Sequence, residues 1–236
     1  MAYQSCFQRF ELKYILTRPQ KEALLRAVEP YMRLDQYGRV TIRNIYYDTP
    51  SYRLIRASIE RPVYKEKLRI RSYRQLVPGE DAFVELKKKF KKVVYKRRLS
   101  MPFHESIDWL KGVDSLQPPG QIGEEIRYFR DFYGDLRPTV FLSYEREAFY
   151  SLDGSDFRVT FDENILARDT DLSLCSQVYG TPILPTELTL LELKAPGAIP
   201  LWLTDFLTKN KIYKTSFSKY GTAYQSLLFK GGKLCV

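Results

Sequence analysis

The chain has 236 residues, of which 44% are hydrophobic and 14% aromatic, and it carries a formal net charge of +10 at pH 7. This composition excludes a globally disordered chain, and the sequence has no run of about 18 apolar residues that would predict a membrane-spanning helix. The excess of positive charge predicts a polyanionic partner, which could be nucleic acid, a phosphate-rich small molecule or an acidic membrane surface.

The eight predicted strands are segments in which polar and apolar residues alternate and β-branched or aromatic residues are enriched. In chain order they are Arg9–Leu16, Val40–Thr49, Tyr64–Gln75, Ala82–Lys89, Lys92–Met101, Thr139–Tyr150, Phe157–Asp162 and Leu188–Lys194. Four helices are predicted, one after the first strand (17–32, with Thr17 as N-cap), one before the sixth (120–134) and two after the eighth (199–209 and 217–229).

This ratio of strands to helices predicts an α+β fold with a large antiparallel sheet and flanking helices. Eight strands are enough to close a barrel with room inside, so we expect a closed, eight-stranded β-barrel tunnel. The sequence shows no repeat and no linker, and we expect a single domain over residues 1–236.

The few histidine and cysteine residues limit the chemistry that the chain can perform. His104 is the only histidine, and Cys6, Cys175 and Cys235 are widely scattered, which argues against a zinc site and against a Cys/His nucleophile pair. The N-terminal residues lack an apolar signal region, so we expect three reduced thiols in a cytoplasmic protein.

Basic residues in the segment 64–74 occupy alternate positions. Lys65, Lys67, Arg69 and Arg71 fall on alternate positions, with Leu68 and Ile70 between them, so in a strand they share one face. The same alternation gathers charged residues in the other strands: Glu11 and Lys13, Glu85 and Lys87, Lys96 and Arg98, Tyr144 and Arg146, Arg158 and Asp162, Glu192 and Lys194.

Two interpretations of this pattern compete. Each charged face could be the solvated side of a half-buried sheet. The recurrence of cations at the centres of nearly all the strands favours the other interpretation, a barrel with a cationic lumen. Two unit charges 4 Å apart repel by roughly 4 kcal/mol at an effective dielectric constant near 20, and bound polyphosphate would turn that repulsion into attraction. The few carboxylates suit Mg²⁺ or Mn²⁺ that bridges to phosphate.

Eight motifs in order resemble the catalytic domain of the vacuolar transporter chaperone (VTC) polyphosphate polymerases, within the triphosphate tunnel metalloenzyme (CYTH-like) superfamily. They read RFELKYIL, IYYDTP, KLRIRSY, FVELKKK, YEREAF, FRVTFDENI, LLELKAPG and SFSKYGTAY. The resemblance implies an antiparallel tunnel that binds triphosphate with Mn²⁺ or Mg²⁺. The implied reaction moves the terminal phosphoryl group of ATP onto a growing inorganic polyphosphate chain.

The resemblance also implies site residues. The phosphate-binding and catalytic set is Lys13, Arg69, Arg71, Lys87, Lys96, Arg146, Arg158 and Lys219, with Lys194 on the same face. The implied metal ligands are Glu192 and Glu11. Neighbouring basic residues are expected to lie on a solvated hairpin outside the site: Lys88, Lys89, Lys91, Lys92 and Arg97.

The sequence departs from the family pattern at two places. Arg9 stands where the wider superfamily has the first acid of its opening E-x-E-x-K motif, which favours a polymerase over a hydrolase. Ser216 stands where the polymerase branch often has another lysine, for which Lys214 is a candidate substitute.

Other functions remain open. A tripolyphosphatase or nucleoside triphosphatase would use the same tunnel, with water as the nucleophile. A non-catalytic module could bind polyphosphate or single-stranded nucleic acid, with tyrosines such as Tyr46 and Tyr73 as stacking platforms. We expect ATP and polyphosphate as partners and no nucleic acid, because carboxylates share the cationic faces. The sequence leaves open the oligomeric state and a membrane-protein partner that exports the product.

Overall fold

The computed structural model describes residues 6–7, 10–60, 62–91, 93–116, 118 and 120–229. Arg9, Lys92, Cys235 and the side chain of Cys6, which the sequence analysis discusses, lie outside this description. Cys175 is a free thiol, as predicted. None of the helices in the described ranges is long and apolar enough to cross a membrane.

All eight predicted strands are present; seven have ends within three residues of the predicted ones, and β9 continues six residues beyond its predicted end. They are β2 (Phe10–Thr17), β4 (Val40–Asp48), β5 (Tyr64–Ser72), β6 (Asp81–Phe90), β7 (Val93–Pro102), β8 (Arg137–Ser151), β9 (Arg158–Arg168) and β11 (Leu188–Ala195). Four further strands were not predicted: β1 (Cys6–Phe7), β3 (Met32–Leu34), β10 (Thr181–Pro182) and β12 (Lys214–Thr215). They have two or three residues each, which is too short for an alternating pattern to be recognised.

The predicted helices are also present, as α1 (Arg18–Val28), α4 (Gln121–Tyr133), α5 (Leu201–Lys209) and α6 (Lys219–Ala223), the last continued by a π-helical turn (Tyr224–Leu228). Thr17 is the N-cap of α1, as predicted, and the structure adds a reciprocal capping box with Gln20. Two short helices were missed, α2 (Arg53–Ile59) and α3 (Phe103–Leu110), because about two turns give little helical periodicity.

The strands form one antiparallel sheet, in the order β1-β7-β6-β5-β4-β8-β9-β11-β2-β12. The remaining two strands pair at its side, β3 with β8 and β10 with β9. The α+β class with an antiparallel sheet and flanking helices is therefore confirmed. The predicted closed barrel is not: among the described residues no pairing joins β1 or β7 to β2 or β12, and the sheet stays open.

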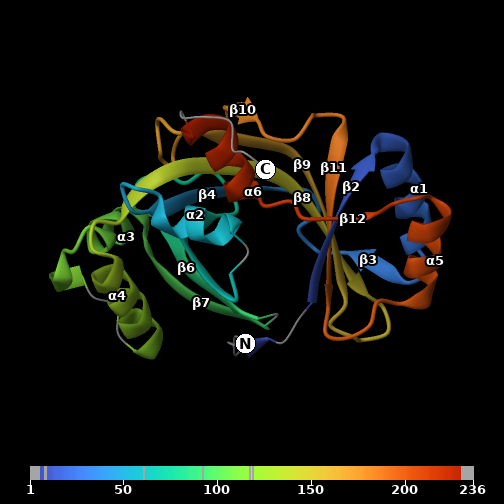
Figure 1. Cartoon of the computed structure of the whole chain (residues 1–236), viewed down its shortest axis with the longest axis horizontal. Coiled ribbons are helices and arrows are strands. Elements are labelled where there is room, and N and C mark those ends of the chain that lie inside the picture. The colour runs from blue at the N-terminus through green and yellow to red at the C-terminus, as the bar shows by residue number, and fades with distance from the viewer. Residues whose placement is uncertain are drawn as a thin grey trace.

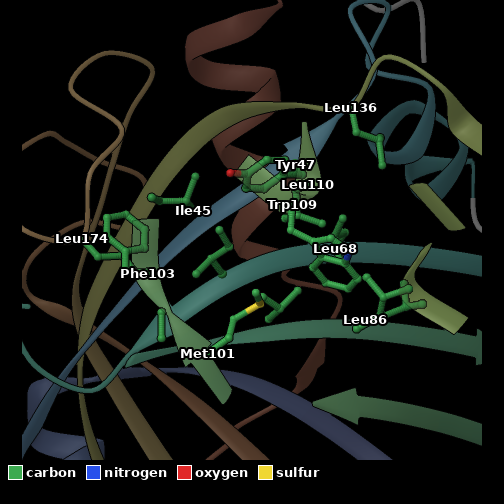
Figure 2. Close-up of a cluster of buried hydrophobic side chains, with 14 of the residues drawn as sticks. Ile45, Tyr47, Leu68, Leu86, Met101, Phe103, Trp109, Leu110, Leu136 and Leu174 are labelled. Carbon is green, nitrogen blue, oxygen red and sulfur yellow. The ribbon is translucent and has the colours of Figure 1, made fainter. Parts of the chain in front are cut away.

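The sheet curves strongly, and its two ends face each other (Figure 1). At one end α3 and α4 lie outside the strands β5 to β7, and at the other end α1 and α5 lie outside β2, β9 and β11. Trp109 of α3 is fully buried against the outer side chains Leu68 and Leu86 (Figure 2). Val159 and Leu193 pack in the same way on α1 and α5. The predicted arrangement, with apolar residues outward under the helices, is thus correct.

Helix α6 lies on the opposite, concave face of the sheet. Its residues Tyr220 and Ala223 are buried with Ile42 of β4 and Leu142 of β8. Because this apolar contact fixes α6 against the strands, the first residue of the helix, Lys219, is held over the charged part of the concave face.

Candidate functional site

The predicted charged residues lie together on the concave face, because residues that pair directly across antiparallel strands point to the same side of the sheet. At one end of the sheet, among β5, β6 and β7, Arg69 lies opposite Glu85, and Glu85 lies opposite Arg98. At the other end, Arg146 of β8 lies opposite Asp162 of β9. Further along, Glu192 lies opposite Lys13, and Lys194 lies opposite both Arg158 and Glu11.

A first ion cluster surrounds Glu85, whose side chain is 1% exposed. Arg69 donates to Glu85 Oε2 from Nε at 2.9 Å and from Nη2 at 2.7 Å. Glu85 Oε1 accepts from Arg98 Nε at 2.7 Å and lies 2.7 Å from Lys96 Nζ, and Arg71 Nε lies 3.8 Å from Oε2. Burial raises the pKa of Glu85, but its four cationic neighbours hold that pKa well below its usual value. Glu85 is therefore an anion that gathers cations from β5 and β7.

Hydroxyl and amide oxygens complete the arginine contacts of this cluster. The Tyr46 hydroxyl accepts from Arg69 Nη1 at 3.0 Å. Asn44 Oδ1 accepts from Arg71 Nε at 2.8 Å, and the Tyr144 hydroxyl accepts from Arg71 Nη2 at 3.0 Å. Such contacts orient the guanidinium planes before any ligand arrives.

A second ion cluster contains two carboxylates, Asp162 and Glu192. Arg146 donates to both Asp162 oxygens at 2.6 Å and to Glu192 Oε2 at 3.1 Å. Lys219 Nζ lies 2.5 Å from Asp162 Oδ2 and 3.0 Å from Glu192 Oε1, which also lies 3.3 Å from Lys13 Nζ. Burial raises the pKa of Glu192, yet Lys219, Lys13 and Arg146 hold it well below the ordinary range.

Side chains connect the two ends of the curved sheet across the concave face. Lys87 of β6 donates to Glu11 of β2 at 2.9 and 3.0 Å. Lys67 of β5 donates to the Ser218 hydroxyl, just before α6, at 3.0 Å. These contacts bring the two clusters into one continuous charged surface, although no backbone pairing between the described residues closes the sheet.

The attraction of Lys87 lowers the pKa of Glu11 to about 2, despite the burial of this carboxyl. Two lysines of the predicted set have depressed pKa values, because burial and neighbouring cations disfavour their charged form. Burial, with the nearby Arg71 and Arg69, lowers the pKa of Lys96 to about 7. Burial, with the nearby Arg146, lowers that of Lys194 to about 8. The concave face therefore holds more positive charge than its carboxylates offset, as a site for anions would.

The structure brings together most of the predicted site residues. Arg158 is the exception: it lies on the same face but pairs with Asp156 at 3.1 Å and contacts neither carboxylate cluster in the described part of the chain. Its Nε is buried and has no hydrogen-bond partner among the described residues. Lys214 is exposed on β12, so it does not replace the lysine that the polymerase branch often has at the position of Ser216.

The hairpin residues predicted to lie outside the site behave in two ways. Arg97 pairs with Glu125 of α4 at 2.9 Å, and Lys88 lies opposite Glu66, both on the outer face. Lys89 is different. It follows Lys87 by two residues on β6, so it points to the same concave face, and it lies opposite Lys65 towards the end of that face. Lys91 lies in the turn after β6, and Lys92 is not described.

Besides Glu85, the centre of the first cluster, sequence reasoning left four residues unassigned that the structure places in the charged surface. Asp162 and Arg98 are members of the two clusters, and Lys67 connects them. The ring of Tyr144 lies under Lys219 Nζ, 4.6 Å from the ring centroid. The same alternation that selected their neighbours also includes these four residues, so the signal to find them was present.

The carboxylates could hold a divalent metal only together with a ligand. The described residues contain no group of three or more acidic, histidine or cysteine side chains arranged for a metal ion. Mg²⁺ commonly uses one or two carboxylates and completes its coordination with water and substrate phosphates. Glu192 and Glu11 are hard oxygen donors on adjacent strands and the same face, and they fit that mode.

A comparison with known protein families places most of the chain in one of them. The family model of the VTC domain matches residues 8–228, nearly the whole chain. No curated protein sequence matches it.

Solved structures share the fold. A proposed adenylate cyclase from Bacillus halodurans is 14% identical, with a TM-score of 0.57, and the match covers 91% of this chain and 96% of that one. A proposed adenylyl cyclase from Hippeastrum, whose structure is described as revealing a dominant triphosphatase activity, is 16% identical with a TM-score of 0.55. That match covers 92% of this chain and 95% of the plant protein. At these identities the likeness shows a common fold.

Proposed function

The chain belongs to the VTC domain family, and on this premise we propose that it transfers the terminal phosphoryl group of ATP to a growing inorganic polyphosphate chain, with a divalent metal. The membership confirms the family predicted from the sequence. The observation that carries the proposal is the continuous cationic surface on the concave face, which gathers Arg69, Arg146 and Lys219 around a few buried carboxylates. A row of phosphates is the ligand whose charge such a surface complements.

Phosphoryl transfer requires little covalent chemistry from a protein, because positioning and charge neutralisation lower the barrier. We assign the four arginines of the predicted set to clamping nucleotide and product phosphates: Arg69, Arg71, Arg146 and Arg158. The lysines orient the chain and stabilise the charge that develops in transfer: Lys13, Lys87, Lys96, Lys194 and Lys219. Arg158 acts beside the two clusters, where its guanidinium pairs with Asp156.

Glu192, with Glu11, would hold Mn²⁺ or Mg²⁺ against the phosphates. Such an ion, when bound, neutralises phosphate oxygens and orients the transferred group. Lys219 Nζ and Lys13 Nζ both contact Glu192 Oε1. With a metal bound, the two lysines would either keep these contacts beside the metal or move to contact phosphate oxygens.

The acceptor in this reaction is a phosphate oxygen that is already anionic, so the site needs no strong general base. This requirement suits a sequence whose single histidine, His104, lies on α3 with a side chain that is 65% exposed. The lysines with lowered pKa remain available to bind anions or to exchange protons.

A second candidate is hydrolysis of triphosphate with water in place of the acceptor phosphate. The fold shared with the Hippeastrum protein, described as having triphosphatase activity, supports it. The products separate the two reactions. We expect purified protein with ATP and Mn²⁺ to form long-chain polyphosphate on a gel, in amounts that grow with the ADP released. Release of orthophosphate without polymer would favour the hydrolase.

A further inference from the structure

Unlike most cations of the concave face, Lys67 contacts no carboxylate among the residues that the structure describes. Arg69, Lys87 and Lys219 each contact a carboxylate within 3.0 Å. For Lys67, in the part of the chain that the structure describes, the contact is the neutral hydroxyl of Ser218 at 3.0 Å. A partly buried ammonium without a countercharge is unfavourable unless an anion arrives.

The groups that face Lys67 come from both ends of the curved sheet. Lys65 and Arg69 flank it on β5, Lys87 lies directly opposite on β6, and Lys13 approaches from β2. Arg69 belongs to the Glu85 cluster and Lys13 to the Glu192 cluster, while Lys87 contacts Glu11. Lys67 therefore lies between these separate groups of ion pairs. The electrostatic potential at its ammonium group is positive, because its nearest charged neighbours are cations.

We propose that Lys67 and the Ser218 hydroxyl form the subsite for the phosphate that lies between the two ion clusters. This inference deepens the proposed function, on which it rests for the identity of the ligand as a chain of phosphates. The ammonium would donate to one phosphate oxygen, and the hydroxyl, which already lies beside Lys67 Nζ and accepts from Gly221 N at 3.2 Å, would donate to the same or the next oxygen.

The environment of Lys67 supports this role and makes it measurable. Burial, followed by the charges of Lys13, Lys87, Lys65 and Arg69, lowers the pKa of Lys67 to about 7. A bound phosphate would supply the missing negative charge and raise that pKa. Above neutral pH, phosphate binding should therefore be accompanied by proton uptake at this residue.

The test is titration calorimetry of inorganic tripolyphosphate in two buffers of different ionisation enthalpy, about one pH unit above the Lys67 pKa. We expect Lys67→Met to weaken binding about tenfold or more and to take up about one proton fewer than the wild type. Lys67→Arg should keep most of the affinity but lose the same proton, because arginine stays protonated. The matched control is Lys88→Met, which removes an equal charge from the outer face.

Wild-type affinity and proton uptake in Lys67→Met would overturn the inference, as would a wild type that does not bind tripolyphosphate. If Lys67→Met does not fold, unchanged proton uptake in Lys67→Arg would overturn it equally. The experiment needs no turnover, so its outcome is separate from that of the proposed function. Binding through Lys67 in a protein that makes no polymer would refute the polymerase and leave the subsite standing.

Discussion

Lys219 Nζ lies 3.0 Å from Glu192 Oε1 and so joins the first residue of α6 to the middle of β11. The sequence separates the two residues by 27 positions, and the packing of α6 on the concave face brings them together. Burial opposes the charge of Lys219, but Asp162 and Glu192 raise the pKa of this lysine above its ordinary value. Lys219 therefore stays positively charged, and its ammonium group can contact a phosphate oxygen in place of a carboxylate oxygen.

The first prediction concerns Glu192. Glu192→Gln should lower metal-dependent turnover of ATP by about 100-fold or more, because it removes the carboxylate proposed to hold the ion. The fold should persist, since Asp162 remains as a partner of Arg146 and Lys219. Turnover measured against Mn²⁺ concentration, with circular dichroism for the fold, checks both statements. Glu145→Gln, on the outer face, is the matched control, and full activity in Glu192→Gln would refute the assignment.

The second prediction concerns Arg69. Arg69→Ala removes a guanidinium that is oriented by Glu85 and Tyr46, and it should weaken ATP and polyphosphate binding about tenfold to 100-fold. Because the lost contacts are ionic, the difference from the wild type should shrink as salt is raised. Affinity measured at low and high ionic strength tests this, and a salt-independent difference would argue for a merely structural role.

The third prediction compares two neighbouring lysines of β6. Lys87 faces Glu11 across the concave surface, whereas Lys88 lies opposite Glu66 on the outer face. Lys87→Met should weaken polyphosphate binding about tenfold, and Lys88→Met should leave it unchanged, although both remove one charge. Equal effects of the two substitutions would mean that net charge, and not the concave site, attracts the ligand.

The fourth prediction concerns pH and Lys96, whose folded-state pKa of about 7 lies below the ordinary value of 10.5. Between these two values the unfolded chain binds more protons than the folded protein, so stability should rise as pH increases from about 7 towards about 10. Thermal unfolding of the protein without ligand should show this rise. Lys96→Met should make the rise smaller but leave part of it, because Lys67 and Lys194 also have lowered pKa values. An identical pH profile in the variant would contradict the assigned pKa.

Alternation was sufficient to predict which residues share the concave face. Lys13, Glu85 and Arg146 lie on three strands that are distant in sequence, and antiparallel pairing keeps all of them on one side of the sheet. A one-residue slip would have moved each strand's apolar residues to the wrong face, so burial of the outer face fixes this register.

Whether the sheet closes into a barrel could not be predicted in the same way. Strand number permits a barrel but does not require one, and the ends of this sheet meet through side chains such as Lys87 and Glu11. Ion-pair partners were equally inaccessible, because the contact of Lys219 with Asp162 depends on where α6 packs. The isolation of Lys67 among cations became visible only when the partners of its neighbours were known.

The most direct test of the concave site is a crystal structure of the protein with tripolyphosphate and Mn²⁺. The account predicts phosphates on the concave face, contacted by Arg69 from one cluster and by Arg146 and Lys219 from the other. Phosphates bound on the outer face, with these three side chains still held by their carboxylates, would contradict it.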